Sequence, residues 1–417
     1  MLLTGCARTS KPQAEANSTL TTSDLKPVRI SAENTDAAEP AVATARDGTV
    51  YVAWVEHHES KEADVWLARL DSEGKVKDSA VRVNPNVGEA TAWRGDPPTL
   101  AVGADGTVHI GWTARLKGEG HGNDLYLSSS RDGGKTFETP VKINDDGKQV
   151  VHGMHSLAVG ADNHIYVAWL DERNVVKPSA MISNGAMQKM EHMEANREVF
   201  FASSADGGRT FSPNQRIAQD ACPCCKTAVT ADALGRVFVS WRQVLPGEYR
   251  HIGLAASEDG GKTFSAPKIV SDDRWMIAAC PVSGPALSVG SDNALRVLWY
   301  TEGEKGGAPG LYWAESRDGG KTFSESKPFA KGQAHGTPLL LASGGSGTTV
   351  IWEYDEGGSS RVMSAPKPWV GEDSATVVAS GGELPSAAMS KDQLFVGYIA
   401  RASDKRSVWV VRAKPVT

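Results

Sequence analysis

The chain concentrates cysteine and histidine in the segments that separate its apolar stretches. Two short motifs, Cys-Pro-Cys-Cys at 222–225 and Cys-Pro at 280–281, hold four of the five cysteines. Thiol, thioether and imidazole groups together are soft donors, which favour copper and, with less methionine, zinc. The sequence therefore predicts a soft-metal site whose candidate ligands are Cys222, Cys224, Cys225, Cys280, His152, Met154, His155 and His335.

The same cysteines allow two other interpretations. In an oxidising compartment four cysteines commonly form two disulfides. Cys225 and Cys280 are candidates for one bridge, whereas a bond between Cys222 and Cys224 would close a strained small ring. A soft-metal site, a thiol-based redox site and a set of structural disulfides all remain open at this point.

A repeated octapeptide indicates which elements position these residues. The pattern Ser-x-Asp-x-Gly-x-Thr-Phe occurs at 130–137, 204–211, 257–264 and 316–323. Its aspartate can bond the backbone two residues on, its glycines tolerate positive φ, and its phenylalanine is expected to be buried. Four copies indicate a repeat architecture in which this turn is structural. The aspartates concerned are Asp132, Asp206, Asp259 and Asp318.

A second marker, an apolar strand ending in an aromatic residue, recurs with the octapeptide. It ends at Trp54, Trp112, Trp169, Trp241, Trp299, Trp352 and Tyr398. An apolar strand and a turn precede it, and two further strands follow, so each unit is a four-stranded sheet. We count seven units, with six possible because the sixth is irregular. The strand that the last unit lacks is expected from Pro27-Val-Arg-Ile30, which would close the ring and remove an exposed sheet edge.

The octapeptides resemble the Asp-boxes (BNR repeats) of the sialidase-like β-propeller superfamily. The resemblance implies an all-β fold in which residues 26–417 form a single propeller. Sialidases have six blades, so a count of seven departs from the family pattern. In a propeller the segments entering each blade emerge on one face and the Asp-box turns on the other. The candidate ligands are therefore expected to converge near one end of the central channel.

The superfamily also implies an alternative function, exo-glycoside hydrolysis by a tyrosine nucleophile with three arginines that bind a carboxylate. The family's opening Phe/Tyr-Arg-Ile-Pro motif is missing, and Asp171-Glu-Arg173, which resembles its Asp-x-Arg segment, falls in the third unit. The available residues are Arg94, Arg197, Arg250 and Arg274, with Tyr249 and Glu248 or Tyr300 and Glu302 as the nucleophile pair.

Two blade entrances combine an aromatic ring with charge, as the rims of ligand sites often do. The candidate ligand-binding residues are Trp93, Arg94, Asp96, Arg274 and Trp275. The alternative for each is structural: a tryptophan that covers the channel mouth and an arginine paired with the aspartate beside it. A third function class is therefore an interaction scaffold stapled by disulfides.

Composition narrows the range of partners. Charged residues make up 23% of the 417 residues, the net charge is −6, and no run is rich in lysine or arginine. Nucleic acid and anionic membrane surfaces are therefore excluded as expected partners. No stretch reaches the roughly 18 apolar residues of a membrane span. A monomer is expected, binding a small ligand, a metal ion or an envelope protein at its loop face.

The N-terminal segment indicates a location. Leu3-Thr-Gly-Cys6 resembles a bacterial lipobox, in which Cys6 would carry the lipid, although only Met1 and Leu2 precede it. The residues that follow are polar and low in bulky apolar groups, so residues 1–25 are expected to be a lipobox and a disordered tether. The predicted location is the cell envelope, as a periplasm-facing lipoprotein of the outer membrane, with membrane contact only through the anchor.

Overall fold

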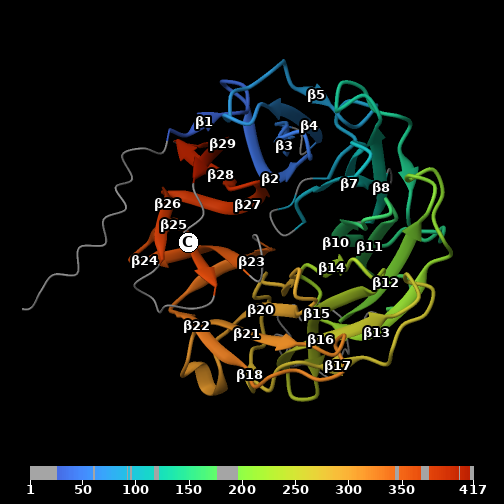
Figure 1. The fold of residues 1–417 in the computed structure, drawn as a ribbon, viewed down its shortest axis with the longest axis vertical. Coiled ribbons are helices and arrows are strands. Elements are labelled where there is room, and N and C mark those ends of the chain that lie inside the picture. Colours follow the sequence, from blue (N-terminus) through green and yellow to red (C-terminus); the bar gives the residue numbers. More distant parts are fainter. Residues whose placement is uncertain are drawn as a thin grey trace, which may run out of the picture.

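The computed structural model describes residues 26–59, 62–91, 93, 96–116, 122–175, 196–342, 347–367, 375–402 and 404–413. Their regular structure is β-strand apart from one short 3-10 turn, η2 (Glu304–Gly306). None of the described segments is an apolar helix of membrane-spanning length. The sheets follow one another around a common axis as the chain runs from blue to red (Figure 1).

Five sheets have four antiparallel strands each, and a sixth has nine. Three of the four-stranded sheets come from the first half of the ring and from its closure: β2 (Asp36–Thr44), β3 (Val50–His57), β4 (Ala63–Leu70) and β5 (Val81–Arg82); β6 (Thr99–Val102), β7 (Val108–Arg115), β8 (Asn123–Ser130) and β9 (Val141–Lys142); β27 (Gly382–Ser390), β28 (Gln393–Ala402), β29 (Lys405–Ala413) and β1 (Val28–Arg29). The other two are β19 (Ala286–Val289), β20 (Leu295–Thr301), β21 (Gly310–Ser316) and β22 (Lys327–Lys331); β23 (Ala334–Ala342), β24 (Thr348–Glu356), β25 (Ser359–Lys367) and β26 (Thr376–Ser380).

The nine-stranded sheet is two four-stranded units joined at one point. Its strands are β10 (His152–Val159), β11 (Ile165–Asp171), β12 (Arg197–Ser204), β13 (Gln215–Ala221), β14 (Ala228–Ala231), β15 (Val237–Leu245), β16 (Tyr249–Ser257), β17 (Lys268–Ile269) and β18 (Trp275–Met276). A single residue pair, Ala221 with Gln243, joins β13 to β15. The short β18 pairs with the end of β16.

The two ends of the described chain meet in one sheet. Val28 of β1 pairs with Val410 of β29, and Arg29 pairs with Trp409. Arg406 adds a two-pronged contact to Asp36 on the next sheet, with Nε–Oδ1 at 2.8 Å and Nη2–Oδ2 at 2.6 Å. The outermost strand of the last sheet therefore comes from the start of the chain.

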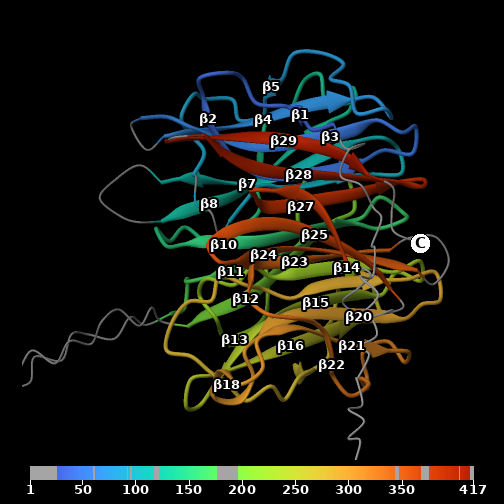
Figure 2. The same cartoon turned by 90° about the vertical axis from the view of Figure 1, so that its left-hand side faces the viewer.

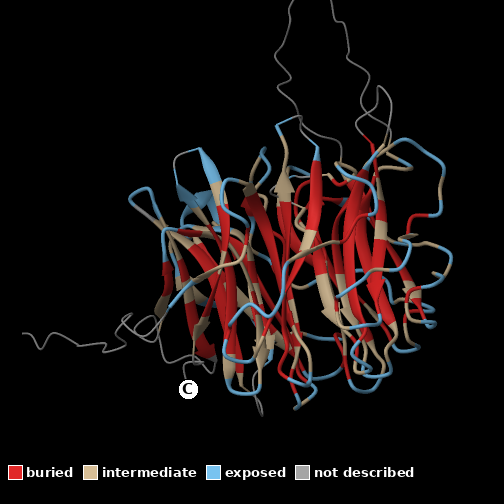
Figure 3. Cartoon of the chain, turned by 90° about the horizontal axis from the view of Figure 1, so that it is seen from above, coloured by how far each residue is buried: buried red, intermediate tan, exposed pale blue. Residues whose placement is uncertain are grey.

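The strands run roughly along the short axis of the ring, so their ends lie on two opposite faces (Figure 2). Buried residues concentrate in the strands and exposed ones in the loops at either end (Figure 3). The recurring aromatic of each second strand is buried in the core, from 0% exposure at Trp169 to 6% at Tyr398. Within one sheet, Trp112 of β7 stacks on Tyr126 of the adjacent strand β8 at a centroid distance of 5.4 Å.

Each octapeptide forms the same hydrogen-bonded turn. In the first copy, Asp132 accepts bonds from Ser130 Oγ at 2.8 Å and from Thr136 Oγ1 at 2.6 Å, while Gly134 N donates to Ser130 Oγ. The closing phenylalanines, expected to be buried, are only partly so, and each packs its ring on the edge of an apolar cluster; they are Phe137, Phe211, Phe264 and Phe323.

These turns predict a loss of stability in acid. The bond from the following threonine hydroxyl holds the pKa of Asp132, Asp259 and Asp318 well below the ordinary 3.8. Because the folded pKa is depressed, the stabilisation is complete above 3.8 and is lost as pH falls through the lower folded value. We expect Tm to fall steeply with acidification, and a triple Asp→Asn variant at these positions to show a shallower fall. Thermal unfolding as a function of pH tests this, with the exposed Asp272→Asn as control.

Candidate functional site

The cysteine motif forms a turn between β13 and β14. Cys222 N donates to Arg242 O on β15 at 2.8 Å, and Cys225 N donates to Cys222 O at 3.4 Å. Arg197 donates to the carbonyl of Pro223 from the neighbouring unit. Cys222, Cys224 and Cys225 are at most 2% exposed, so the turn folds inward and buries its sulfur atoms.

The loop that carries Cys280 packs directly on this turn. Gly284 lies so close to Lys226 that a Cβ added there would come within 2.0 Å of the Lys226 carbonyl oxygen. This approach, which any larger residue would prevent, allows Cys224 and Cys280 to form a disulfide with their Cα atoms 5.9 Å apart. Cys224 is buried, whereas Cys280 is exposed.

The other two cysteines of the 222–225 motif, Cys222 and Cys225, lie against this disulfide as free thiols. The thiol of Cys225 donates to Cys222 Sγ at 3.2 Å, and Cys222 Sγ is 3.9 Å from Cys224 Sγ. The suggested bridge between Cys225 and Cys280 is wrong, because Cys225 directs its sulfur at Cys222 and leaves Cys224 facing the neighbouring loop. All four sulfur atoms nevertheless gather in one place.

A buried arginine stands beside the thiols. Arg242 has no exposed surface; its Nε donates to Ser283 O and its Nη2 to Tyr300 O, both at 2.8 Å. Its guanidinium lies 5.0 Å from the ring of Trp275. Within the described part of the chain, Nη1 has no hydrogen-bond partner and no carboxylate forms an ion pair with this arginine.

These surroundings shift the pKa values of the two thiols in opposite directions. The hydrogen bond from Cys225 lowers the pKa of Cys222 to about 7, with the positive charge of Arg242 acting in the same direction and burial against it. Burial, and then the adjoining Cys222, raises the pKa of Cys225 well above its ordinary value. Cys222 is therefore the more acidic thiol of the pair.

Met154 belongs to the same apolar cluster as the three buried cysteines. It is 1% exposed and adopts a φ of 55°, while its carbonyl accepts a bond from Thr227 N at 3.0 Å. The structure thus brings one of the predicted soft thioether donors into the region of the cysteines.

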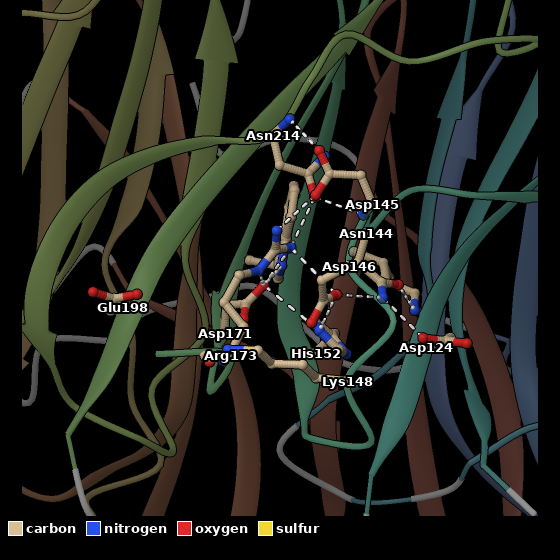
Figure 4. A network of polar contacts seen from close by, with 12 residues as sticks. Asp124, Asn144, Asp145, Asp146, Lys148, His152, Asp171, Arg173, Glu198 and Asn214 are labelled. Carbon is tan, nitrogen blue, oxygen red and sulfur yellow. Dashed lines mark hydrogen bonds and ion pairs between the residues drawn. The ribbon is translucent and has the colours of Figure 1, made fainter. Parts of the chain in front are cut away.

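His152 lies in a different polar network (Figure 4). Its Nδ1 is 2.7 Å from Asn123 O and its Nε2 is 2.9 Å from Asp146 Oδ1. Asp171, beside it, accepts bonds from Trp169 Nε1 at 2.8 Å and Arg173 Nε at 3.0 Å. Both ring nitrogens of His152 thus face oxygen atoms. His152, which was predicted as a metal ligand, lies instead in the polar network that contains Asp171 and Arg173.

His155 forms a third group with Asp96 and Lys226. His155 Nδ1 is 3.0 Å from Asp96 Oδ1, and both side chains are buried. Burial alone would raise the pKa of Asp96, but His155 and then Lys226 lower it overall. Burial lowers the pKa of Lys226 to about 8, opposed by Asp96. The imidazole of His155 is therefore held by a carboxylate.

A cavity of about 780 Å³ lies on the axis of the ring. The innermost strand of every unit lines it: β2, β6, β10, β14, β19, β23 and β27. Lys226 and His335 also line it, His335 as an exposed residue at the start of β23. Trp93, which is 47% exposed, lies between this cavity and a second one of about 470 Å³ that Asp96, Met154 and Arg197 line.

The other predicted rim residues do not lie together. Trp275 is 2% exposed and packs edge-on against Tyr300 at 5.7 Å, so its ring belongs to the core. Arg274 points to solvent, with Nη2 at 3.9 Å from Glu304 Oε1. Arg94, Cys6 and the histidine- and methionine-bearing insertion around 181–193 lie outside the described residues.

Arg242 and Lys226 were not anticipated from the sequence. A signal for Arg242 existed: it is the one charged residue directly after the apolar run 237–241, in a strand whose neighbours are buried. Lys226 directly follows the cysteine motif, and its Nζ donates to Pro97 O at 3.4 Å, a contact between units that are distant in sequence.

Solved structures share this fold. An ulvan lyase of polysaccharide lyase family PL25 is 11% identical with a TM-score of 0.59, and the match covers 94% of this chain and 97% of that one. Polysaccharide lyase Uly1 is 13% identical with a TM-score of 0.54, covering 90% of each chain. The Hadza microbial sialidase Hz136 aligns more distantly, at 13% identity and a TM-score of 0.48 over 94% and 95% of the two chains. No protein-family model and no curated protein matches this chain. The lyase comparisons establish an all-β, propeller-type fold.

Proposed function

We propose that this chain is a thiol–disulfide redox protein whose centre lies where successive sheets begin on the loop face of a propeller. The observation that carries the proposal is the reduced pair Cys222 and Cys225 lying against the Cys224–Cys280 disulfide, with 3.9 Å between Cys222 Sγ and Cys224 Sγ. Purely structural disulfides do not require two further thiols at this distance.

The chemistry of the free pair supports the proposal. Cys222 and Cys225 have Cys-x-x-Cys spacing, in which a lowered pKa of the first cysteine is typical of disulfide oxidoreductases. The pKa of Cys222 is lowered in that sense, to about 7. Thiolate is the attacking form in disulfide exchange, so Cys222 is ready to react at neutral pH.

Soft-metal binding by the same residues is the companion proposal. One sulfur from each of Cys222, Cys224 and Cys225 lies within 4.8 Å of the others, and Met154 packs in the same cluster. Copper or zinc would require Cys224 in its thiolate form, because a disulfide sulfur is not a thiolate ligand. The redox proposal therefore requires the Cys224–Cys280 disulfide, whereas the metal proposal requires that this bond is reduced.

Thiol counting together with metal analysis tests both proposals. In anaerobically purified, denatured Cys6→Ser protein, which retains the four loop cysteines, we expect two titratable thiols and one disulfide. Four thiols with stoichiometric copper or zinc that disappears in Cys224→Ser would instead establish the metal site. Four thiols without metal would contradict both.

A glycan-processing activity is the second candidate, favoured by the axial cavity. Its volume of about 780 Å³ and its lining, which includes Trp93, Lys226 and Glu353, suit a saccharide unit. Two solved structures of the same fold are polysaccharide lyases. Release of unsaturated product from ulvan, or of fluorophore from a sialoside, tests for lyase and sialidase activity respectively; the absence of both removes this candidate.

The wider organisation remains part of the proposal. Seven blades closed by β1 are supported by the seven innermost strands around one cavity and by the pairing of β1 with β29. We place the protein in the cell envelope, periplasm-facing and held to the outer membrane by a lipid on Cys6, as a monomer whose loop face meets a small ligand, a metal ion or an envelope protein. Metabolic labelling with a fatty-acid analogue, lost in Cys6→Ser, tests the anchor.

A further inference from the structure

We propose that the buried pair Cys222 and Cys225 passes two electrons to the Cys224–Cys280 disulfide through a transient Cys222–Cys224 bond, with Arg242 holding the attacking thiolate. The inference rests on the proposed thiol–disulfide function and adds the direction of electron transfer between the two cysteine pairs. Electrons move from a protected pair to a pair that reaches the surface.

The placement of the sulfur atoms supports this order. Cys222 Sγ lies between two other sulfurs, 3.2 Å from Cys225 Sγ and 3.9 Å from Cys224 Sγ. Cys222 and Cys225 are each 1% exposed, whereas Cys280 is exposed. A soluble disulfide therefore reaches the free thiols poorly, and Cys280 is the accessible end of the assembly.

Arg242 explains why Cys222 attacks. A buried guanidinium without a carboxylate partner is unfavourable unless another anion lies near it. Among the described groups that face Arg242, the Asp273 carboxyl has a pKa that burial raises and the charge of Arg242 lowers. Cys222 lies next to Arg242, since its backbone N donates to Arg242 O at 2.8 Å, and the charges of Arg242 and then Arg250 favour its thiolate.

The exchange balances in two steps. The Cys222 thiolate attacks Cys224 Sγ, forming a Cys222–Cys224 disulfide and releasing Cys280 as a thiolate. Cys225 then loses its proton to the released thiolate and attacks Cys222 Sγ, forming Cys222–Cys225 and releasing the Cys224 thiolate. Two thiol groups are oxidised and one disulfide is reduced, with no outside reactant.

The Cys222–Cys224 disulfide is expected to be short-lived. A bond between residues two apart closes a strained small ring, so the Cys222–Cys224 disulfide is readily resolved. Its formation also removes the negative charge that, after burial, keeps the pKa of Cys225 high. Cys225 therefore becomes easier to ionise at the moment its attack is required. The exposed Cys280 thiol is then available to reduce a disulfide of a partner protein.

Trapping tests the relay. In the Cys6→Ser background, Cys225→Ser removes the second step, so excess iodoacetamide should alkylate the released Cys280 and leave a Cys222–Cys224 disulfide, detected by peptide mapping. The matched Cys222→Ser variant should keep Cys224–Cys280 intact and resist labelling at Cys280. We expect at least a tenfold difference in Cys280 labelling between the two variants.

The outcomes separate the relay from the proposed function. Unlabelled Cys280 with an intact Cys224–Cys280 bond in Cys225→Ser overturns the relay and leaves a disulfide redox protein. Four thiols in the Cys6→Ser protein overturn the proposed function itself. Both variants are first shown to unfold cooperatively. Where the buried hydroxyl prevents folding, Cys225→Ala replaces Cys225→Ser and is assayed above the ordinary thiol pKa, because alanine also removes the hydrogen bond that favours the Cys222 thiolate. Equal labelling in Cys222→Ser and the trap variant also overturns the relay.

Discussion

Replacing Arg242 with methionine is expected to raise the pKa of the Cys222 thiol from about 7 and to slow its reactions at neutral pH. The substitution keeps an unbranched side chain against Trp275 but removes the positive charge beside the sulfur. The hydrogen bond from Cys225 remains, so we expect a rise of about one unit rather than a complete return to the ordinary value. That change lowers the thiolate fraction at pH 7 roughly fivefold.

The pH dependence of Cys222 alkylation measures this effect. The charge-retaining Arg242→Lys variant is the matched control, because it loses the guanidinium fork but keeps a cation near the thiols. Its midpoint should stay closer to that of the wild-type protein. An unchanged midpoint in Arg242→Met would show that the charge of Arg242 does not set the acidity of Cys222. Both variants also leave the carbonyls of Ser283 and Tyr300 with altered partners, so their folding is checked by thermal unfolding.

Replacing Asp171 with alanine is expected to destabilise the protein by about 3–5 kcal/mol. Asp171 is fully buried and accepts bonds from Trp169 Nε1, Arg173 N and Arg173 Nε at 2.7–3.0 Å. Its removal leaves a buried indole N–H and part of a buried guanidinium without their acceptor. Urea unfolding measures the change in the free energy of unfolding.

The same arginine provides the control. Asp145 contacts Arg173 Nη1 at 2.6 Å, but its side chain is 48% exposed. Solvent can replace that contact, so Asp145→Ala is expected to cost about 1 kcal/mol or less. Equal losses in the two variants would mean that the burial of Asp171 does not determine its contribution.

The repeating core was predictable from the sequence because the same short patterns recur from unit to unit. The buried aromatics from Trp54 to Tyr398 occupy equivalent second strands, and the octapeptide turns form the hydrogen bonds expected of their residue types. Local patterns of two to eight residues determine these features. The collection of the cysteines at one end of the ring was predictable for a related reason: it requires only that every unit begins on the same face.

The site itself was less predictable because it depends on pairings between units. Whether Cys224 or Cys225 meets Cys280 is decided by the conformation of one buried turn, which composition does not reveal. His152 has the right residue type for a ligand, but its Nδ1 bonds Asn123 O at 2.7 Å and its Nε2 lies 2.9 Å from Asp146 Oδ1, both from the preceding unit. The charge of Arg242 lowers the pKa of Cys222, which lies twenty positions earlier in the chain. No sequence motif links the two residues.

The position of β1 has a practical consequence. Because it is the outermost strand of its sheet, the backbone enters the fold at the perimeter of the ring and far from the axial cavity. A lipid, a solid support or a fused reporter joined ahead of residue 26 would therefore be attached at the side of the disc. The end that carries Cys280 would remain free to meet a second protein, so immobilised material is suitable for capture experiments with the cysteines unobstructed.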